Sequence, residues 1–347
     1  MARRSDRFLE RLGDASRVTF LSHVQPDPDS LASMMGLAQL VQEKWDIPTR
    51  LTRDGIISRA ENKAMVECLG LDLIPIEEIE LIANEMVVMV DSQPNTGRHN
   101  LDGEIPVHFV IDHHETRGDL EDVLFVDIRP ALGATCTLVT SYLREQGVEP
   151  ERKVATGLWY GIETELAGFP REAGPNDDNA QEYLFPLADK NLLARIRHAR
   201  LPQSYFGCLV QALQSSFIYD NLIISWISDL PQPELAAEVV EYLIRFEEVD
   251  WAVCVGLHDN QLILSMRAAK ANAQAGELLK KVVGDMGRAG GHDRRAGGCV
   301  PLPGPGVALL ESVQVELRRR LLKVLQIDEQ RGQRLVSRKE LLQNLQS

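Results

Sequence analysis

This 347-residue sequence has no excess of basic residues, no closely paired cysteines and no long apolar run. No apolar run approaches the roughly 18 residues that a membrane-spanning helix needs, so we expect no membrane association. The N-terminal stretch MARRSDRFLERLGD lacks the apolar core of a secretory signal, which favours a cytoplasmic protein. The five cysteines are dispersed without C-x-x-C spacing, and this favours reduced thiols over disulfides or zinc ligands.

Basic side chains are outnumbered, with 37 Lys and Arg against 51 Asp and Glu, and the formal net charge is -14. Long duplex nucleic acid is held mainly through its phosphates by a basic face, so the composition argues against that partner. Small phosphate-bearing substrates remain compatible, because metal ions can supply positive charge locally. Hydrophobic residues at 44% and charged residues at 25% are ordinary for a globular chain.

The first half of the chain alternates short β-branched runs with longer helical patterns. This alternation is typical of strand-helix-strand units, so we expect an α/β fold whose N-terminal domain has a parallel sheet with helices on both faces. We expect strands at Val18–Leu21, Thr49–Thr52, Met86–Val90, Val107–Ile111 and Val123–Val126. We expect helices to begin after Ser30, Ala134 and Glu151.

A smaller α/β pattern follows the first. NLIISWIS is typical of a strand, PELAAEVVEYLIRFE of a helix, and WAVCVGLHDNQLILSMRA of two strands joined at Asp259–Asn260. We therefore expect a first α/β domain at 1–191, a helical linker at 192–216, a second and smaller α/β domain at 217–304 and a helical tail at 305–347. The tail has the amphipathic pattern of a capping or oligomer-forming helix, so a homodimer is one assembly to consider.

Three predicted strands run from apolar residues into His or Asp, in the segments TFLSH, VVMVDSQP and HFVIDHHE. The first continues into LSHVQPDPDS, whose Asp-Pro-Asp is also good turn chemistry. Because the carboxyl ends of parallel strands share one edge of a sheet, these side chains are expected to converge. The convergent set is His23, Asp27, Asp29, Asp91, Asp112, His113 and His114.

Imidazole and carboxylate ligands together suit Mn, Fe, Co or Zn better than Ca. A shared carboxylate suits two ions roughly 3.5–4 Å apart, which activate a water and clamp a phosphoryl oxygen. The sequence therefore indicates metal-dependent hydrolysis of a phosphate compound.

These motifs resemble the DHH phosphoesterase superfamily, which has a RecJ-like core. The motif H-x-x-x-D-x-D-S matches His23, Asp27, Asp29 and Ser30, a strand-ending aspartate matches Asp91, and the triplet is Asp112-His113-His114. A fourth motif, G-[LI]-x-x-D-T-G-x-F, appears as GIETELAGF, in which Glu165 replaces the aspartate and Glu163 is its rival.

The resemblance implies a role for each matched residue. One metal would lie on His23, Asp27 and Asp91, and a second on Asp29, Asp91, His113 and Glu165. His114 would face the scissile phosphate as a polarising group or acid, and Asp112 would orient the ligand histidines. The implied cofactor is two Mn²⁺ ions, with Mg²⁺ or Co²⁺ as alternatives.

The resemblance extends to the DHH-associated module called DHHA1, which carries an S-x-R strand and a glycine-rich loop. Here SMRA contains Arg267, and AGGHDRRAG contains Gly290, Gly291 and His292. Ala289 and Arg295 depart from the usual glycine and alanine. These residues are implied to bind the substrate, because glycines let backbone amides approach an anion and Arg and His add charge-assisted hydrogen bonds.

Within the DHH superfamily, the sequence resembles the branch that contains nanoRNases, phosphoadenosine-phosphate phosphatases and dinucleotide phosphodiesterases. It implies a hydrolase that cleaves short oligonucleotides or dinucleotides in the manner of an exonuclease, or nucleoside 3',5'-bisphosphates. One alternative is pyrophosphate or polyphosphate hydrolysis, although VSRKELL at Val336–Leu342 reads better as solvated helix than as that class's basic motif. Another alternative is a nucleotide-binding protein whose catalysis is impaired by the departures around Glu165.

Overall fold

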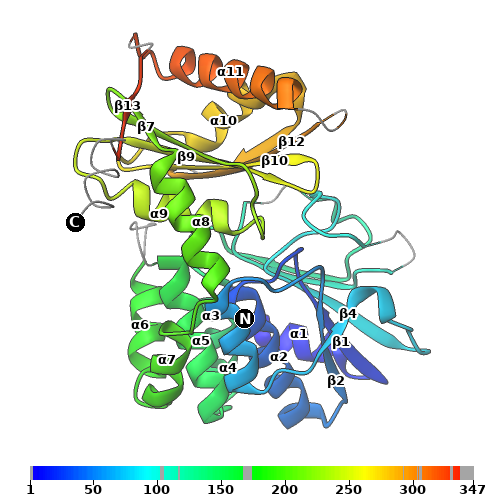
Figure 1. Cartoon of the computed structure of the whole chain (residues 1–347). Coiled ribbons are helices and arrows are strands. Elements are labelled where there is room, and N and C mark those ends of the chain that lie inside the picture. The colour runs from blue at the N-terminus through cyan, green and yellow to red at the C-terminus, as the bar shows by residue number, and fades with distance from the viewer. Residues whose placement is uncertain are drawn as a thin grey trace. The chain divides into compact units, whose positions relative to one another are not determined.

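The computed structural model describes residues 3–101, 105–115, 118–166, 174–291, 293–302, 304, 307–328 and 331–336. The chain divides into two compact units, Met1–Arg200 and Leu201–Ser347 (Figure 1). All five cysteines are free thiols. No helix in the described ranges is long and apolar enough to cross a membrane.

The first unit is built on a six-stranded parallel sheet in the order β3-β2-β1-β4-β5-β6. Its strands are β1 (Arg17–Leu21), β2 (Thr49–Arg53), β3 (Leu73–Pro75), β4 (Glu85–Val90), β5 (Phe109–Asp112) and β6 (Phe125–Ile128). Its helices are α1 (Arg4–Leu12), α2 (Pro28–Trp45), α3 (Ala60–Leu69), η1 (Ile76–Glu78), α4 (Thr135–Glu145), α5 (Arg152–Leu166), α6 (Pro175–Leu184) and α7 (Lys190–Arg197). The predicted strands are confirmed to within two residues, whereas the short β3 was not predicted.

The two faces of this sheet are covered differently. One face carries Val18, Phe20 and Val88, which pack in a single core with side chains from helices α1 to α7. The other face carries Leu21, Val87, Met89 and Val110, which pack against connecting segments through residues such as Leu81, Leu120 and Val123. The expected α/β class is confirmed, but the expectation of helices on both faces is corrected for the described residues. The segments joining β3 to β4, β4 to β5 and β5 to β6 cover the second face with loops.

The strand order reverses beside β1. From β1 the chain runs outward through β2 and β3, and it then returns to the other side of β1 as β4. At such a switch point the loops after two adjacent strands diverge and leave room for a ligand at the carboxyl edge. His23 follows β1 and Asp91 follows β4, so both lie at this position.

The second unit contains a seven-stranded sheet in the order β11-β12-β10-β9-β8-β7-β13, in which only the β8–β9 pair is parallel. Its strands are β7 (Phe217–Tyr219), β8 (Leu222–Ile227), β9 (Trp251–His258), β10 (Gln261–Ala268), β11 (Arg288–Gly291), β12 (Arg295–Pro301) and β13 (Gln333–Arg334). Its helices are α8 (Gln203–Gln214), α9 (Leu235–Leu243), α10 (Ala275–Val283), η2 (Gly284–Met286) and α11 (Val307–Val324). The predicted hairpin at Asp259–Asn260 is confirmed, and both turn residues have positive φ, 43° and 62°.

The predicted linker and the predicted tail differ from what the structure shows. The stretch 192–216, expected as a linker, contains the end of α7 in the first unit and the whole of α8 in the second. The predicted tail begins with α11, whose Leu317 and Leu321 are fully buried in the core of the second unit. The described part of α11 is therefore a layer of that unit.

Candidate metal centre

His23 follows β1 and presents one ring nitrogen to the carboxyl edge of the sheet. Its Nδ1 donates to the Val24 carbonyl at 2.9 Å, which fixes the tautomer. Its Nε2 is buried without a hydrogen-bond partner, 3.6 Å from Asp27 Oδ2 and 3.5 Å from Asp91 Oδ2. Buried polar atoms are seldom left unpartnered, so this nitrogen is a candidate metal ligand.

The two aspartates of the Asp-Pro-Asp stretch lie at the start of helix α2. Asp27 is the N-cap and accepts from the Ser30 amide at 3.0 Å, and Pro28 begins the helix. The turn chemistry of this stretch is therefore real, and it also fixes the two carboxylates. Asp29 is completely buried and points toward helix α4.

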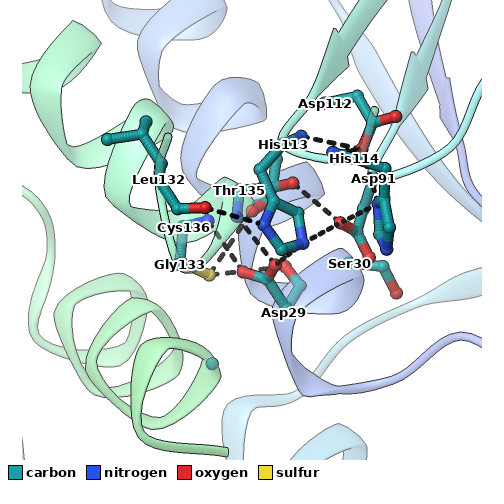
Figure 2. Close-up of polar contacts among 12 residues, drawn as sticks. Asp29, Ser30, Asp91, Asp112, His113, His114, Leu132, Gly133, Thr135 and Cys136 are labelled. Carbon is teal, nitrogen blue, oxygen red and sulfur yellow. Dashed lines mark hydrogen bonds and ion pairs between the residues drawn. The ribbon is translucent and has the colours of Figure 1, made fainter. Parts of the chain in front are cut away.

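Asp29 is held by the first amides of α4. Its two oxygens accept from Thr135 N at 2.8 Å and Cys136 N at 2.7 Å (Figure 2). A Cβ on Gly161 would stand 3.1 Å from Asp29 Cα and 3.0 Å from the Pro28 carbonyl, so α5 can approach α2 this closely only with glycine there. The glycine of the fourth motif thus brings α5 up to the site.

Asp91 occupies the middle of the cluster. It has a left-handed backbone, with φ of 57°, which aspartate adopts more easily than most residues. Its Oδ1 accepts from the Thr135 hydroxyl at 2.7 Å and lies 3.5 Å from His113 Nε2. Because Oδ2 faces His23 instead, the two oxygens of Asp91 face two different imidazoles.

His113 repeats the geometry of His23. Its Nδ1 donates to the Leu132 carbonyl at 3.1 Å, and its buried Nε2 has no hydrogen-bond partner (Figure 2). That nitrogen also lies 3.9 Å from Asp29 Oδ2. The two ring nitrogens and the carboxylates thus converge from β1, α2, β4 and β5.

Asp112 and His114 form a network beside this cluster. Asp112 Oδ1 accepts from His114 Nδ1 at 2.8 Å and from the amides of His113 and His114. Its other oxygen accepts from Gln93 Nε2 at 2.7 Å. Gln93 in turn accepts from the Gly118 amide at 3.0 Å, which ties down the segment that follows the triplet.

The cluster favours positive charge on imidazole. Burial alone lowers the pKa of His23, but the neighbouring carboxylates of Asp27 and Asp91 outweigh it and raise the pKa to about 10. Burial raises the pKa of Asp29 well above its usual range, and the charges of Asp91, Glu165 and Asp27 add to that effect. Burial also acts against ionised Asp112, but the hydrogen bond and charge of His114 hold its pKa low.

These side chains fit a cation. Ligand atoms about 2.0–2.2 Å from an ion lie roughly 3–3.5 Å from one another, which is close to the imidazole-to-carboxylate distances here. Two groups can each converge on one ion: His23, Asp27 and Asp91, and Asp91, His113 and His114. Asp91 belongs to both groups. The second includes His114, whereas the sequence predicted Asp29, 3.9 Å from His113.

Glu163 and Glu165, both on α5, have different surroundings. Glu163 accepts two hydrogen bonds from the Arg197 guanidinium, one of them from Nε at 2.8 Å. The charge of Glu165 raises the pKa of Asp29, so Glu165 is near the cluster. Of the two candidates for the fourth motif, Glu165 is the better placed. The rest of that motif, from 167 to 169, lies outside the described residues.

Asp54 ties together three loops at the same edge. This buried residue accepts from Asn100 N at 2.6 Å and Asn100 Nδ2 at 2.8 Å, and its carbonyl accepts from Gln25 N at 2.8 Å. Between these contacts the Arg98 carbonyl accepts from Val24 N at 2.7 Å. Burial raises the pKa of Asp27, but the neighbouring His23 lowers it by more. The charge of exposed Arg98 lowers the pKa of Asp27 further.

The predicted substrate residues lie in the second unit. Arg267 is buried, donates to Ser265 Oγ at 3.1 Å and the Met266 carbonyl at 3.0 Å, and pairs with Glu241 at 2.9 Å. Gly290 and Gly291 end β11, and a Cβ on Gly276 at the start of α10 would meet the Gly291 carbonyl at 2.5 Å. The glycines therefore lie against a helix N-terminus. His292 is outside the described residues.

Several site residues were missed by sequence reasoning. Gln93, Thr135, Arg98 and Asp177 carry no metal-binding signature. Leu132 contributes its carbonyl, and Cys136 contributes its amide and its thiol, which donates to the Asp29 carbonyl at 3.3 Å. The one available signal was the position of GATCT at the start of a predicted helix close behind the triplet. A helix N-terminus there could have been expected to hold a carboxylate.

The fold and the ligand set define an α/β protein with a buried histidine–carboxylate centre at the switch point of a parallel sheet. Residues 17–162 match the DHH family, N-terminal domain. Over these residues the chain is similar to proteins of the DHH family.

Curated relatives cover much of the chain at modest identity. An uncharacterised protein of Methanocaldococcus jannaschii is 29% identical over 89% of this chain and 64% of its own length. The cyclic-di-AMP phosphodiesterase GdpP of Bacillus subtilis is 25% identical over 82% and 45%. A probable manganese-dependent inorganic pyrophosphatase of Streptococcus pyogenes is 24% identical over 51% and 57%. The chain thus spans less than two thirds of the length of each.

One solved structure shares the fold. An exopolyphosphatase-related protein from Bacteroides fragilis superposes with a TM-score of 0.74 at 15% identity, over 93% of this chain and 97% of that one. The likeness extends over both units and concerns the fold alone.

Proposed function

We propose that the protein is a metal-dependent phosphoesterase that hydrolyses short oligonucleotides, dinucleotides or nucleoside 3',5'-bisphosphates. The observation that carries the proposal is the placement of two buried, unpartnered Nε2 atoms, of His23 and His113, against different oxygens of Asp91. Such an arrangement suits two ions that share one carboxylate. The relatives named as a phosphodiesterase and a pyrophosphatase support hydrolysis at phosphorus.

The ions proposed are two Mn²⁺, with Mg²⁺ or Co²⁺ as alternatives. His23, Asp27 and Asp91 would hold one, and Asp91, His113, Asp29 and Glu165 would hold the other. Bound there, divalent ions supply Lewis acidity for a water and positive charge for a phosphoryl group. The manganese dependence in the name of the streptococcal relative supports this choice.

The residues around the ions would position and protonate the substrate. Asp112 fixes His114 through Nδ1, so Nε2 of that ring is the atom that can donate a proton toward a leaving oxygen. Thr135 and the α4 amides hold Asp91 and Asp29 in one orientation, so the carboxylates do not have to reorganise during reaction. Exposed Arg98 supplies positive charge at the rim, where a substrate phosphate would need it.

A nucleotide substrate is favoured by the second unit. Gly290 and Gly291 end β11 beside the first turn of α10, and the absence of side chains there lets an anionic group approach the backbone closely. Arg267 and His292 stay proposed substrate contacts. The net charge of -14 supports small substrates over long duplex nucleic acid. Cytoplasmic location and a homodimer remain predictions from the sequence.

A panel of substrates tests the proposal. Purified protein with Mn²⁺ should release mononucleotide from short RNA or a dinucleotide, or phosphate from a 3',5'-bisphosphate, and Asp91→Asn should abolish turnover. A cyclic dinucleotide belongs in the same panel because of the GdpP relative. Failure of every nucleotide in the panel would reject the proposal.

Pyrophosphate or polyphosphate hydrolysis is the second candidate, favoured by the streptococcal relative. The metal centre suits it equally, since either reaction needs water activated beside a phosphoryl group. Faster turnover of pyrophosphate than of any nucleotide would establish it. A nucleotide-binding protein without turnover is the remaining alternative, and it would bind Mn²⁺ and nucleotide but release no product.

A further inference from the structure

Asp177, at the start of α6, is completely buried and accepts four hydrogen bonds. Its Oδ1 and Oδ2 accept from the Gly133 amide at 3.1 and 3.0 Å, Thr137 Oγ1 donates at 2.5 Å, and the Gly174 amide donates at 2.9 Å. Capping α6 accounts for the Gly174 contact alone. The other three contacts reach the turn before α4 and its first turn.

The Gly133 amide and the Leu132 carbonyl belong to one peptide group. That group is planar, so its N–H and its C=O point in opposite directions. Asp177 holds the N–H side, and His113 Nδ1 donates to the C=O side at 3.1 Å. A single rigid unit therefore connects a buried carboxylate to a proposed metal ligand.

This connection acts on His113 in two ways. The carboxylate fixes the peptide plane and thereby the direction in which the imidazole ring lies. A hydrogen bond accepted from the N–H also polarises the peptide, which makes the Leu132 carbonyl a better acceptor. A stronger Nδ1–H contact raises the basicity of Nε2, as carboxylate partners do for metal-bound histidines.

The environment of Gly133 agrees with this reading. A Cβ at this position would meet Leu166 Cδ2 at 2.5 Å and Asp177 Oδ2 at 3.1 Å. Only a glycine lets the carboxylate reach the amide with both oxygens. The two residues after the turn, Thr135 and Cys136, hold Asp91 and Asp29, so the same turn serves three proposed ligands.

We propose that Asp177 is a positioning residue of the metal centre, acting on His113 through the Leu132–Gly133 peptide group. The inference rests on the proposed function, because it concerns the same centre. Asp177→Asn keeps the size of the side chain but removes the charge and one acceptor oxygen. The expected result is a dissociation constant for Mn²⁺ about 10–100-fold higher than in the unmodified protein, the usual effect of losing such an outer partner.

Glu85→Gln is the matched control. Glu85 is also buried and fully bonded, but it lies at the amino end of β4, six residues before Asp91. At roughly 3.3 Å per residue this places it about 20 Å from the centre. We expect Glu85→Gln to lower the melting temperature and leave the Mn²⁺ dissociation constant unchanged. An equal loss of affinity in both variants would overturn the inference, since general destabilisation would then explain it.

Two further measurements keep the test decisive. Thr137→Val removes one donor to Asp177 and keeps the carboxylate, so it should fold if Asp177→Asn does not, and weaken Mn²⁺ binding by several-fold. In metal-free protein, the Nδ1–H resonance of His113 should shift in Asp177→Asn and stay in place in Glu85→Gln. An unchanged resonance with unchanged Mn²⁺ affinity would sink the inference. If the unmodified protein bound no Mn²⁺, the proposed function would fail, while the resonance would still report on Asp177.

Discussion

Glu163 and Glu165 are two positions apart on α5 and therefore lie roughly 200° apart around the helix axis. The first is held by Arg197, and the charge of the second reaches Asp29. One carboxylate is thus paired with a basic side chain, and the charge of the other acts on a residue of the proposed metal centre. Both were candidates for the fourth motif, and we propose Glu165 as the metal ligand.

Glu165→Gln is expected to weaken Mn²⁺ binding and lower turnover by about 10–100-fold, since it removes a charge beside the second proposed ion. Glu163→Gln is the matched control on the same helix and should change turnover less than about threefold, because it breaks only a partly exposed ion pair. Calorimetry with Mn²⁺ and initial rates measure both. Equal losses in the two variants would show that α5, and not the Glu165 carboxylate, is what matters.

Gln93→Leu should reduce kcat by about tenfold while Mn²⁺ affinity changes little. The glutamine amide holds Asp112 Oδ2, and without it the carboxylate that orients His114 can rotate. Because His114 is proposed to protonate the leaving group, the alkaline limb of the pH–rate profile, where this acid loses its proton, should move as well. A Gln93→Leu enzyme with an unchanged profile would contradict the role given to this network.

Arg98→Gln should raise KM for a nucleotide substrate by about tenfold or more, the worth of a lost charge-assisted hydrogen bond. Binding of Mn²⁺ should be unchanged or slightly tighter, because a positive charge near Asp27 is removed. Arg98→Lys keeps the charge and should recover part of the loss. Steady-state kinetics measure the expected rise in KM, and metal titration measures the unchanged or tighter Mn²⁺ binding. A weaker Mn²⁺ affinity with an unchanged KM would refute the proposed contact of Arg98 with the substrate.

The buried Glu85 makes stability depend on pH. Burial opposes its ionised form, but hydrogen bonds from Arg17 and Thr19 and the charge of Arg50 hold its pKa below the usual 4.5. A carboxyl with a lowered pKa stabilises the fold above its unfolded value and loses that contribution as the pH falls through the folded value. Metal-free protein should therefore lose stability below about pH 4.5 more steeply than Glu85→Gln does. Chemical denaturation at pH 3 to 6 measures the difference, and parallel curves would contradict it.

The sequence predicted the strands and their shared edge because both follow from local patterns. A run such as VVMVD marks a buried strand and its end in the same five residues. The histidines and aspartates after three such strands had to meet once the sheet was parallel. The convergence at Asp91 followed from the same reasoning, whereas the order of the strands became known only from the structure.

The partners of these residues could not be predicted in the same way. Gln93 and Asp177 act through contacts with residues 19 and 44 positions away along the chain, and neither belongs to a recognisable spacing. The one-sided arrangement of the helices was also missed, since periodicity shows that a helix has a buried face but not which face of the sheet it covers. The spacing of the fourth motif also could not show that Glu163 pairs with Arg197 or that the charge of Glu165 acts on Asp29.

The left-handed backbone of Asp91 places the stability of the fold in conflict with the proposed metal binding. A residue with a Cβ is destabilised by about 1 kcal/mol at a φ of 57°, whereas glycine adopts this angle without strain. Selection for heat resistance alone would therefore drift toward glycine at this strand tip. A library of variants screened only for thermal stability would therefore be expected to accumulate Asp91→Gly, and these stable variants would lack the proposed activity.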